Sequence, residues 1–113
     1  MPEAACYQVL TTTATKEEAA LVADALLEKR LAACVQVAGP LESRYWWQGR
    51  LELAAEWLCV AKTTEDRLEE VVATIRLTHS YDTPEVTATR IAYGDRSYLE
   101  WIAEEVHQRG PQS

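Results

Sequence analysis

Residues 44–52 read RYWWQGRLE, in which two adjacent tryptophans come just before a glutamine and a glycine. Gln48 and Gly49 predict a tight turn, so the segments on either side are expected to pair as one long hairpin. Neighbouring side chains on a strand point to opposite faces, so Trp46 and Trp47 cannot share one face. Each face of the hairpin therefore carries a large aromatic side chain that must be shielded from water by other parts of the protein.

A two-residue turn sets the register of this hairpin and places Trp47 opposite Arg50 and Trp46 opposite Leu51. An antiparallel sheet with one side in water normally shows a clear polar face, which is missing here. One face would carry Trp46, Leu51, Leu53, Ala55, Trp57 and Cys59, and the other Leu41, Tyr45, Trp47, Leu58 and Val60, with Glu52 and Glu56 among them. Each large aromatic left in water forgoes roughly 1.5–3 kcal/mol of burial. We therefore expect the hairpin to pack against another copy of the chain, the alternative being a monomer whose last helix covers the second face.

The length of 113 residues fits a single domain over residues 1–113, with loose ends expected in the first few residues and after Arg109. A net charge of −7 argues against nucleic-acid binding, which needs a concentrated positive surface. No apolar run approaches the roughly 20 residues needed to cross a bilayer, and MPEAACYQVL lacks the pattern of a signal peptide. Cys6, Cys34 and Cys59 are far apart, and we expect three small buried hydrophobes in a reducing cytoplasm.

Hydrophobic periodicity predicts the remaining elements. Thr15 followed by Glu18 is a capping-box signature for the first helix, and Pro40 after Gly39 indicates an edge or a bulge in the second strand. The expected strands are residues 5–12, 34–47, 50–63 and 84–92, and the expected helices are residues 16–30, a segment from Thr63 or Thr64 to about 78–81, and residues 96–108. This order predicts an α+β, ferredoxin-like βαββαβ fold with an antiparallel sheet, a long hairpin and a C-terminal helix. Both crossover helices should lie on one side of the sheet.

Residues 77–85 read LTHSYDTPE and contain the candidate site. His79 lies at the expected end of the second helix, close to a turn that carries Tyr81, Asp82 and Glu85. An imidazole with a carboxylate suits zinc or copper(II), so His79 and Glu85 are the candidate metal ligands. Two ligands are too few for a tight site, and a third would come from elsewhere in the fold or from a second chain. The alternative is a core or capping histidine that hydrogen-bonds to the backbone.

Other polar residues are expected around this segment. Residues 11–13 close the first strand and could approach the same region. Lys62 could bind an anion or pair with Glu85, and pairing is favoured. Asp82 is expected to make a hydrogen bond within its turn, and His107 is expected to be solvated. No glycine-rich phosphate loop, serine nucleophile motif or Cys-His spacing is present, so we expect no enzyme.

Several segments, taken together, resemble the CutA family of divalent-cation tolerance proteins. In chain order they are LLEKRLAACVQVAGPLESRYWWQGRLE, AKTT, HSYDTPE and GDRSYLEWI, and they span nearly the whole sequence. The resemblance implies a ferredoxin-like subunit in a tight cytoplasmic homotrimer, whose sheets join through the long hairpins in a shape similar to the PII signalling proteins. It also implies binding of copper and other divalent cations and a link to metal tolerance.

The resemblance also implies a set of ligands. In some bacterial members these are a cysteine that ends the first strand and the histidine and glutamate of an H-P-Y-x-x-P-E motif. His79 and Glu85 match the motif, whereas Thr11 stands in place of the cysteine and Ser80 in place of the first proline. Without the thiolate, we expect a weaker site with oxygen and nitrogen ligands that accepts zinc, nickel or copper(II), in place of tight copper(I) binding.

Two other functions stay open at this point. One is a PII-like signalling or small-ligand-binding trimer, with clefts between subunits near Tyr81, Lys62 and Glu85. The chain lacks the long flexible loop that such regulators use. The other is a structural trimer with no specific ligand.

Overall fold

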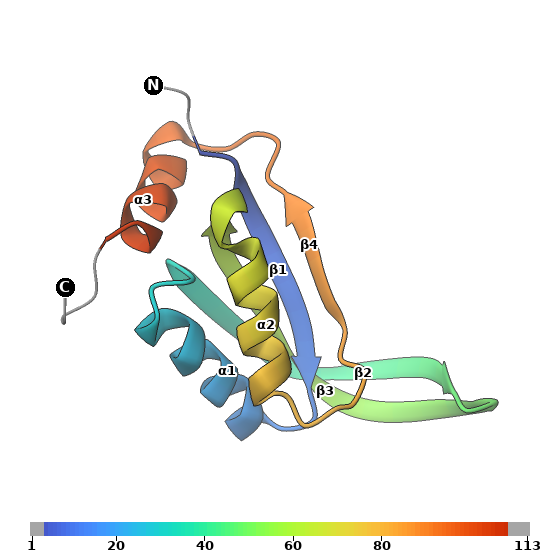
Figure 1. Cartoon of the computed structure of the whole chain (residues 1–113). Helices are drawn as coiled ribbons and strands as arrows, with labels where there is room; N and C mark the ends of the chain where they lie inside the picture. The colour runs from blue at the N-terminus through green and yellow to red at the C-terminus, as the bar shows by residue number, and fades with distance from the viewer. Residues whose placement is uncertain (1–3, 109–113) are drawn as a thin grey trace.

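A computed structural model describes residues 4–108, so the loose ends expected at both termini lie outside the described residues. The fold is a four-stranded antiparallel sheet in the order β2-β3-β1-β4, with α1 and α2 together on one face (Figure 1). The strands are β1 (Cys6–Thr13), β2 (Cys34–Trp47), β3 (Arg50–Thr64) and β4 (Val86–Arg90), and the helices are α1 (Lys16–Glu28), the 3-10 turn η1 (Glu65–Arg67), α2 (Leu68–Thr78) and α3 (Arg96–Val106). The predicted ferredoxin-like α+β fold with a C-terminal helix is confirmed.

Helix α1 begins at the predicted cap but ends earlier than expected. The Thr15 Oγ1 atom accepts a hydrogen bond from the Glu18 N–H at 3.0 Å. At the other end, Arg30 adopts a left-handed conformation with φ 57°. The Arg30 N–H bonds to the Leu27 carbonyl and the Leu31 N–H to the Leu26 carbonyl, which together form a Schellman motif. This motif stops the helix at Glu28, although the residues that follow it have good helix propensity.

The hairpin has the predicted register, with Trp46 opposite Leu51 and Trp47 opposite Arg50. Its turn residue Gly49 has φ 77°, and the preceding glutamine has φ 50°, the pair of left-handed conformations that a two-residue hairpin turn needs. The pairing shifts between Ala38 and Leu41, around the Gly-Pro pair, so the predicted irregularity of the second strand is confirmed.

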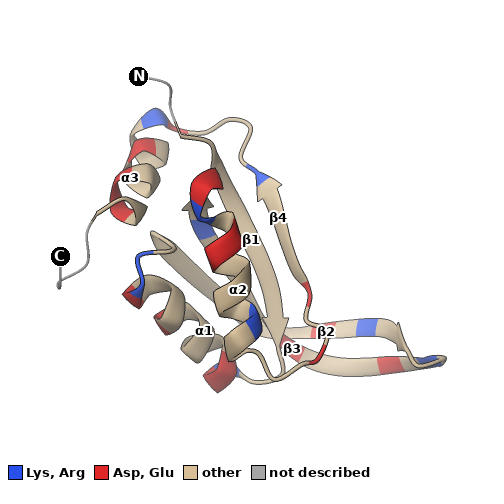
Figure 2. Cartoon of the chain, viewed as in Figure 1, with Lys and Arg blue, Asp and Glu red and all other residues tan. Residues whose placement is uncertain are grey.

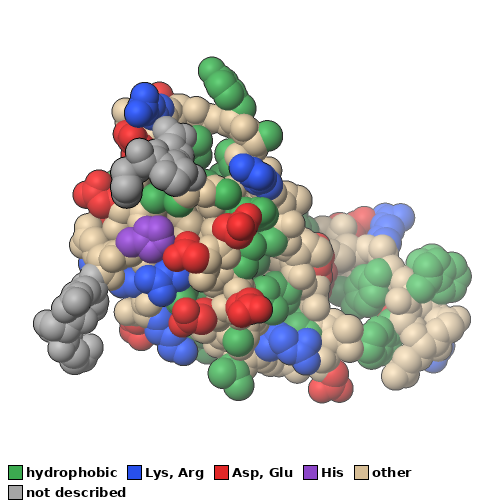
Figure 3. All heavy atoms as spheres, turned by 45° about the horizontal axis from the view of Figure 1, so that its top comes forward, with side chains coloured by type: hydrophobic (Ala, Val, Ile, Leu, Met, Phe, Trp, Pro, Cys, Tyr) green, Lys and Arg blue, Asp and Glu red, His purple; other side chains and the backbone are tan. Residues whose placement is uncertain are grey.

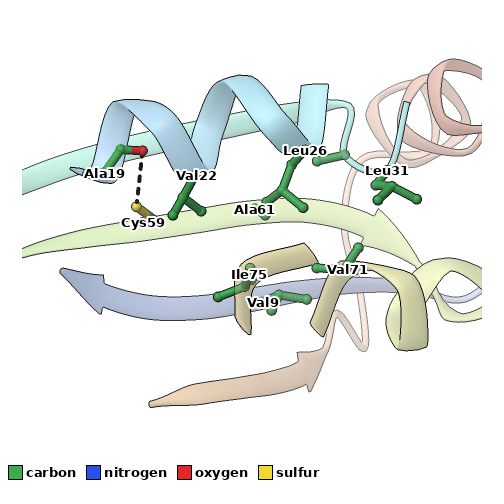
Figure 4. Close-up of a cluster of buried hydrophobic side chains, with 10 residues drawn as sticks. Val9, Ala19, Val22, Leu26, Leu31, Cys59, Ala61, Val71 and Ile75 are labelled. Atoms are coloured by element: carbon green, nitrogen blue, oxygen red, sulfur yellow. Dashed lines mark hydrogen bonds between the residues drawn. The ribbon is translucent and has the colours of Figure 1, made fainter. Parts of the chain in front are cut away.

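The hydrophobic core lies between the sheet and the two crossover helices (Figure 4). Its largest fully buried apolar side chains include Val9, Val22, Leu26, Leu31, Val71 and Ile75. Cys59 also belongs to this core, and burial raises the pKa of its thiol to about 11, so the thiol is neutral at physiological pH. Cys6 is buried as predicted, but Cys34 is only half-buried, because it begins the edge strand β2.

Helix α3 packs at the far end of the sheet from the hairpin tip (Figure 1). It therefore leaves the hairpin uncovered. The expected alternative, in which the last helix covers the second face, holds only at this far end, where Tyr98 meets Lys62. Trp46, Leu51 and Leu53 are 73%, 65% and 64% exposed. Hydrophobic side chains gather on this projecting arm (Figure 3), whereas most acidic residues lie on the helices (Figure 2). Within residues 4–108, no helix has the length and apolar character needed to cross a membrane.

Candidate functional site

A cavity of about 750 Å³ opens where the base of the hairpin meets the loop after α2. Strands β1, β2 and β3 supply one part of its wall, and residues 81–85 supply the other. Its aromatic and acidic wall residues are Tyr45, Trp47, Tyr81, Glu56, Asp82 and Glu85. Two parts of the predicted segment, Tyr81 and Glu85, therefore do meet in one cleft.

Glu56 is the buried acid of this cavity, with only 7% of its surface exposed. Its Oε2 atom accepts a hydrogen bond from the Tyr81 hydroxyl at 2.8 Å. Burial, followed by this hydrogen bond, raises the pKa of Tyr81 well above its usual range, so the phenol stays protonated. The sequence showed Glu56 only as a charge among apolar hairpin residues, and its role depends on a contact 25 positions away.

His79 follows α2 directly, and its side chain is fully buried. Its Nε2 atom lies 2.7 Å from the Thr12 carbonyl oxygen, and its Nδ1 atom accepts the Tyr81 N–H at 3.2 Å. Because Nδ1 accepts, the proton belongs on Nε2, which donates to Thr12. The end of β1 thus approaches this segment, as predicted, and the ring binds backbone through both nitrogens.

Glu18 connects α1 to the same loop. Its Oε2 atom accepts the Ser80 N–H at 2.7 Å and its Oε1 atom accepts the Ser80 hydroxyl at 3.0 Å. The carboxylate also lies 3.5 Å from His79 Nδ1. The predicted capping box is therefore only half formed, because Glu18 holds the loop instead of reaching back to the helix start. A proline in place of Ser80 could not donate this backbone hydrogen bond.

Thr11 and Glu85 lie on different sides of the sheet. Thr11 is 1% exposed and pairs with the core residue Cys59, whereas its neighbour Thr12 lines the cavity with Glu85. Side chains alternate along a strand, so the Thr11 hydroxyl points away from the cavity. Glu85 makes no hydrogen bond or ion pair with any residue from 4 to 108.

The described residues of this chain do not form a metal site by themselves. In the described part of the chain, no group of three or more His, Cys, Asp or Glu side chains is arranged to hold a metal ion. Zinc sites use three or four protein ligands, and both nitrogens of His79 already bind backbone atoms. Metal binding by His79 and Glu85 therefore stays a prediction.

Two other expectations from the sequence, for Lys62 and Asp82, are wrong. Lys62 does not pair with Glu85, because its Nζ atom donates to Gln36 Oε1 at 2.9 Å and to the Tyr98 hydroxyl at 3.4 Å. It also does not line the cavity. Asp82 lines the cavity and makes no hydrogen bond within residues 4–108. His107, which follows α3, is exposed as expected, and its Nε2 also lies 3.0 Å from Asp66 Oδ2.

Comparisons with known proteins agree with this fold over nearly the whole chain. The family model described as CutA1 divalent ion tolerance protein matches residues 7–105. The divalent-cation tolerance protein CutA of Thermus thermophilus is 41% identical over 96 residues, which are 85% of this chain and 93% of that relative. A solved CutA structure from Archaeoglobus fulgidus, described as a periplasmic divalent cation tolerance protein, is 38% identical with a TM-score of 0.87, and the match covers 90% of this chain and 99% of that one. CutA1 from Oryza sativa is 34% identical with a TM-score of 0.90, over 95% of this chain and 98% of that one. This chain belongs to the CutA1 divalent ion tolerance protein family.

Proposed function

We propose that this chain acts in divalent-cation tolerance as a homotrimer that binds copper(II), zinc or a similar ion, and that it is not an enzyme. The names of its relatives support a role in tolerance to divalent cations. The single observation that supports self-association is the uncovered hairpin, on which Trp46, Leu51 and Leu53 are each more than 60% exposed. Burial of three such side chains would contribute roughly 1.5–3 kcal/mol each.

For the metal, the proposal rests on Glu85, a cavity carboxylate without a hydrogen bond in the described part of the chain. His79 can join it only if the ring gives up its bond to Thr12 or to the Tyr81 N–H. Such a bond contributes on the order of 1 kcal/mol. Because a further ligand would also have to come from a neighbouring subunit, binding should be weak to moderate.

Titration calorimetry with copper(II) and with zinc tests this proposal on the wild type, His79→Ala and Glu85→Gln. Both substitutions should weaken binding, while Glu69→Gln, an exposed acid on α2, should leave it unchanged. His79→Ala removes two backbone contacts and could loosen the loop, so Glu85→Gln is the decisive variant. If the affinity for both metals is the same in Glu85→Gln and the wild type, Glu85 is not a ligand.

A PII-like small-ligand-binding trimer is the second candidate, and the cavity beside Tyr81 and Glu85 favours it. Lys62, the residue that would have attracted an anion, does not line that cavity. A thermal-shift screen of nucleotides tests this candidate, and stabilisation by one of them would favour it over metal binding. A trimer that binds neither metals nor nucleotides would be purely structural.

The cytoplasm is the proposed location, and the three free cysteines support it, because free thiols are typical of a reducing compartment. The Archaeoglobus fulgidus relative is described as periplasmic. Cell fractionation with an antibody against this chain distinguishes the two locations, and recovery outside the cytoplasm would contradict the proposal.

A further inference from the structure

We propose that Glu18 is a positioning residue of the candidate site. From α1 it holds the loop of residues 79–85, between α2 and β4, and it thereby sets the affinity for a ligand that it does not touch. The inference rests on the proposed function only for the identity of that ligand. It starts from the number of groups of this loop that one carboxylate contacts.

The loop leaves α2 beside the start of α1 (Figure 1). Glu18, in the first turn of α1, receives both donors of Ser80, since the N–H reaches Oε2 at 2.7 Å and the hydroxyl reaches Oε1 at 3.0 Å. The same carboxylate lies 3.5 Å from Nδ1 of His79. Ser80 itself is exposed, so packing in the core does not fix its position. The contact with Glu18 therefore ties this point of the loop to the helix.

The surroundings of Glu18 strengthen these two hydrogen bonds. Its side chain is only 12% exposed, so little water competes for the carboxylate. Hydrogen bonds to an ionised acceptor are roughly twice as strong as those between neutral groups. The first turn of a helix also favours a negative charge. Because both oxygens of one carboxylate bind two donors of one residue, the contact fixes the direction of the loop as well as its distance from α1.

The position of this loop determines where the cavity residues after Ser80 lie. Tyr81 and Glu85 belong to the loop and line the cavity, whereas Glu18 does not line it. Glu18 can therefore act on a bound ligand only through the loop. If the contact with Ser80 is lost, the loop spends part of its time away from this position. The affinity then falls with the fraction of molecules that remain competent to bind.

Hydrogen exchange of the backbone amides, followed by NMR on the full chain, tests the contact without any ligand. In Glu18→Ala the Ser80 amide should exchange about tenfold faster or more, while the amide of Val22, in the middle of α1, should keep its rate. Glu17→Ala, an exposed acid in the same turn, is the matched control and should leave Ser80 unchanged. The same Ser80 exchange rate in Glu18→Ala and the wild type would overturn the inference.

Two conservative variants separate the hydrogen bonds from the charge and from the stability of α1. Glu18→Gln can accept the Ser80 N–H and donate to the Ser80 hydroxyl, so its exchange should stay much closer to the wild type than that of Glu18→Ala. Ser80→Ala changes an exposed loop residue, leaves α1 intact and removes only the hydroxyl bond. It should speed exchange of the amide at position 80 by less than Glu18→Ala does. No change in Ser80→Ala would show that the hydroxyl does not contribute to the contact and would overturn its role.

Calorimetry with zinc and with copper(II) tests the effect on the site. Glu18→Ala should weaken binding by about threefold or more, and Glu18→Gln should bind like the wild type. Equal affinity of Glu18→Ala and the wild type would overturn the positioning role. An equal loss in Glu18→Gln and Glu18→Ala would also overturn it, because Glu18 would then act through its charge or as a ligand. A wild type that binds neither metal would contradict the proposed function, and the exchange rates would then decide the role of Glu18 alone.

Discussion

Thr11 and Thr63 show how the surroundings of a single hydroxyl change its effect on stability. Both side chains are almost fully buried on the helix-facing side of the sheet, at 1% and 0% exposure. The Thr63 hydroxyl donates to the Leu31 carbonyl at 2.7 Å. The Thr11 hydroxyl has no hydrogen-bond partner within residues 4–108. A buried polar group without a partner costs free energy, whereas a bonded one contributes.

Thr11→Val should raise the free energy of unfolding by up to about 1 kcal/mol, because valine has nearly the same shape and no hydroxyl to leave unpaired. Thr63→Val, the matched control, should lower it by about 1 kcal/mol. Urea unfolding at equal protein concentration measures both. A loss of stability in Thr11→Val as large as that in Thr63→Val would show that the Thr11 hydroxyl has a partner in solution.

At this scale the sequence identified the right segment but only part of its chemistry. The spacing of His79, Tyr81 and Glu85 pointed to one region, and Tyr81 and Glu85 do share a cavity. The sequence could not show that Glu18 would hold this loop or that Glu56 would bond to Tyr81. Both contacts join residues that are far apart in the chain, so only the packing of separate elements creates them.

Among the elements, η1 and α3 are joined by a polar clamp. Asp66 Oδ1 accepts the Thr64 hydroxyl at 2.6 Å, and its carboxylate lies 3.0 Å from His107 Nε2 after the end of α3. Arg67 adds a bond to the Val106 carbonyl at 2.8 Å. The bond from Thr64, followed by that from His107, holds the pKa of Asp66 below its ordinary value of 3.8.

Because the folded pKa of Asp66 is lowered, its contribution to stability is present above its unfolded pKa, near 3.8, and is lost as the pH falls through the folded pKa. The difference in unfolding free energy between wild type and Asp66→Asn should therefore shrink as the pH falls from about 5 through the folded pKa of Asp66. Denaturant unfolding across this range measures it, with Asp24→Asn, an exposed acid on α1, as the control. A difference that does not change with pH would contradict the clamp.

Gly39 lies at the irregularity in β2 and packs closely against Trp57, a contact that a substitution can test. A β carbon placed on Gly39 would lie 2.7 Å from Cε3 of Trp57, so the indole would have to move. Gly39→Ala should lower the free energy of unfolding by about 1–3 kcal/mol, the usual range for overpacking. Gly94→Ala is the control, since its β carbon would lie 3.4 Å from the flexible Leu99 side chain. Equal stability of the two variants in thermal unfolding would refute the close contact.

The sequence predicted the ends of helices and strands correctly where a local turn or cap determines them. The turn at Gln48 and Gly49 fixed the register of the hairpin, and Thr15 fixed the start of α1. The sequence did not predict the end of α1. Arginine rarely adopts the left-handed conformation that ends this helix at Arg30. The expected strand at residues 84–92 is shorter, at Val86–Arg90, because the regular pairing with β1 covers only these residues.

For the whole molecule, the sequence predicted that the apolar hairpin must pack against another surface. The described part of the chain supplies no such surface. The hairpin projects from the rest of the molecule (Figure 1), which measures 50 × 33 × 21 Å with the hairpin included. Trp46 on this hairpin is 73% exposed. Residue patterns indicate that a partner surface is missing, but they do not indicate how many copies supply it. The number three comes from the family resemblance and is part of the proposal.

Trp46→Glu should weaken self-association, because a charge buried in an apolar interface without a partner costs several kcal/mol. Leu77→Glu is the matched control, since Leu77 is 85% exposed but lies on α2 and not on the hairpin. Size-exclusion chromatography with light scattering compares the two variants at the same concentration. If both variants keep the mass of the wild type, the tip of the hairpin does not form the interface.

Sedimentation equilibrium of the unmodified chain, from micromolar to nanomolar concentration, tests self-association through the hairpin most directly. The account predicts a species of three times the chain mass that persists to the lowest concentration at which it is detected. A folded, soluble single chain at every concentration would contradict it, because the apolar hairpin would then be stable in water without a partner.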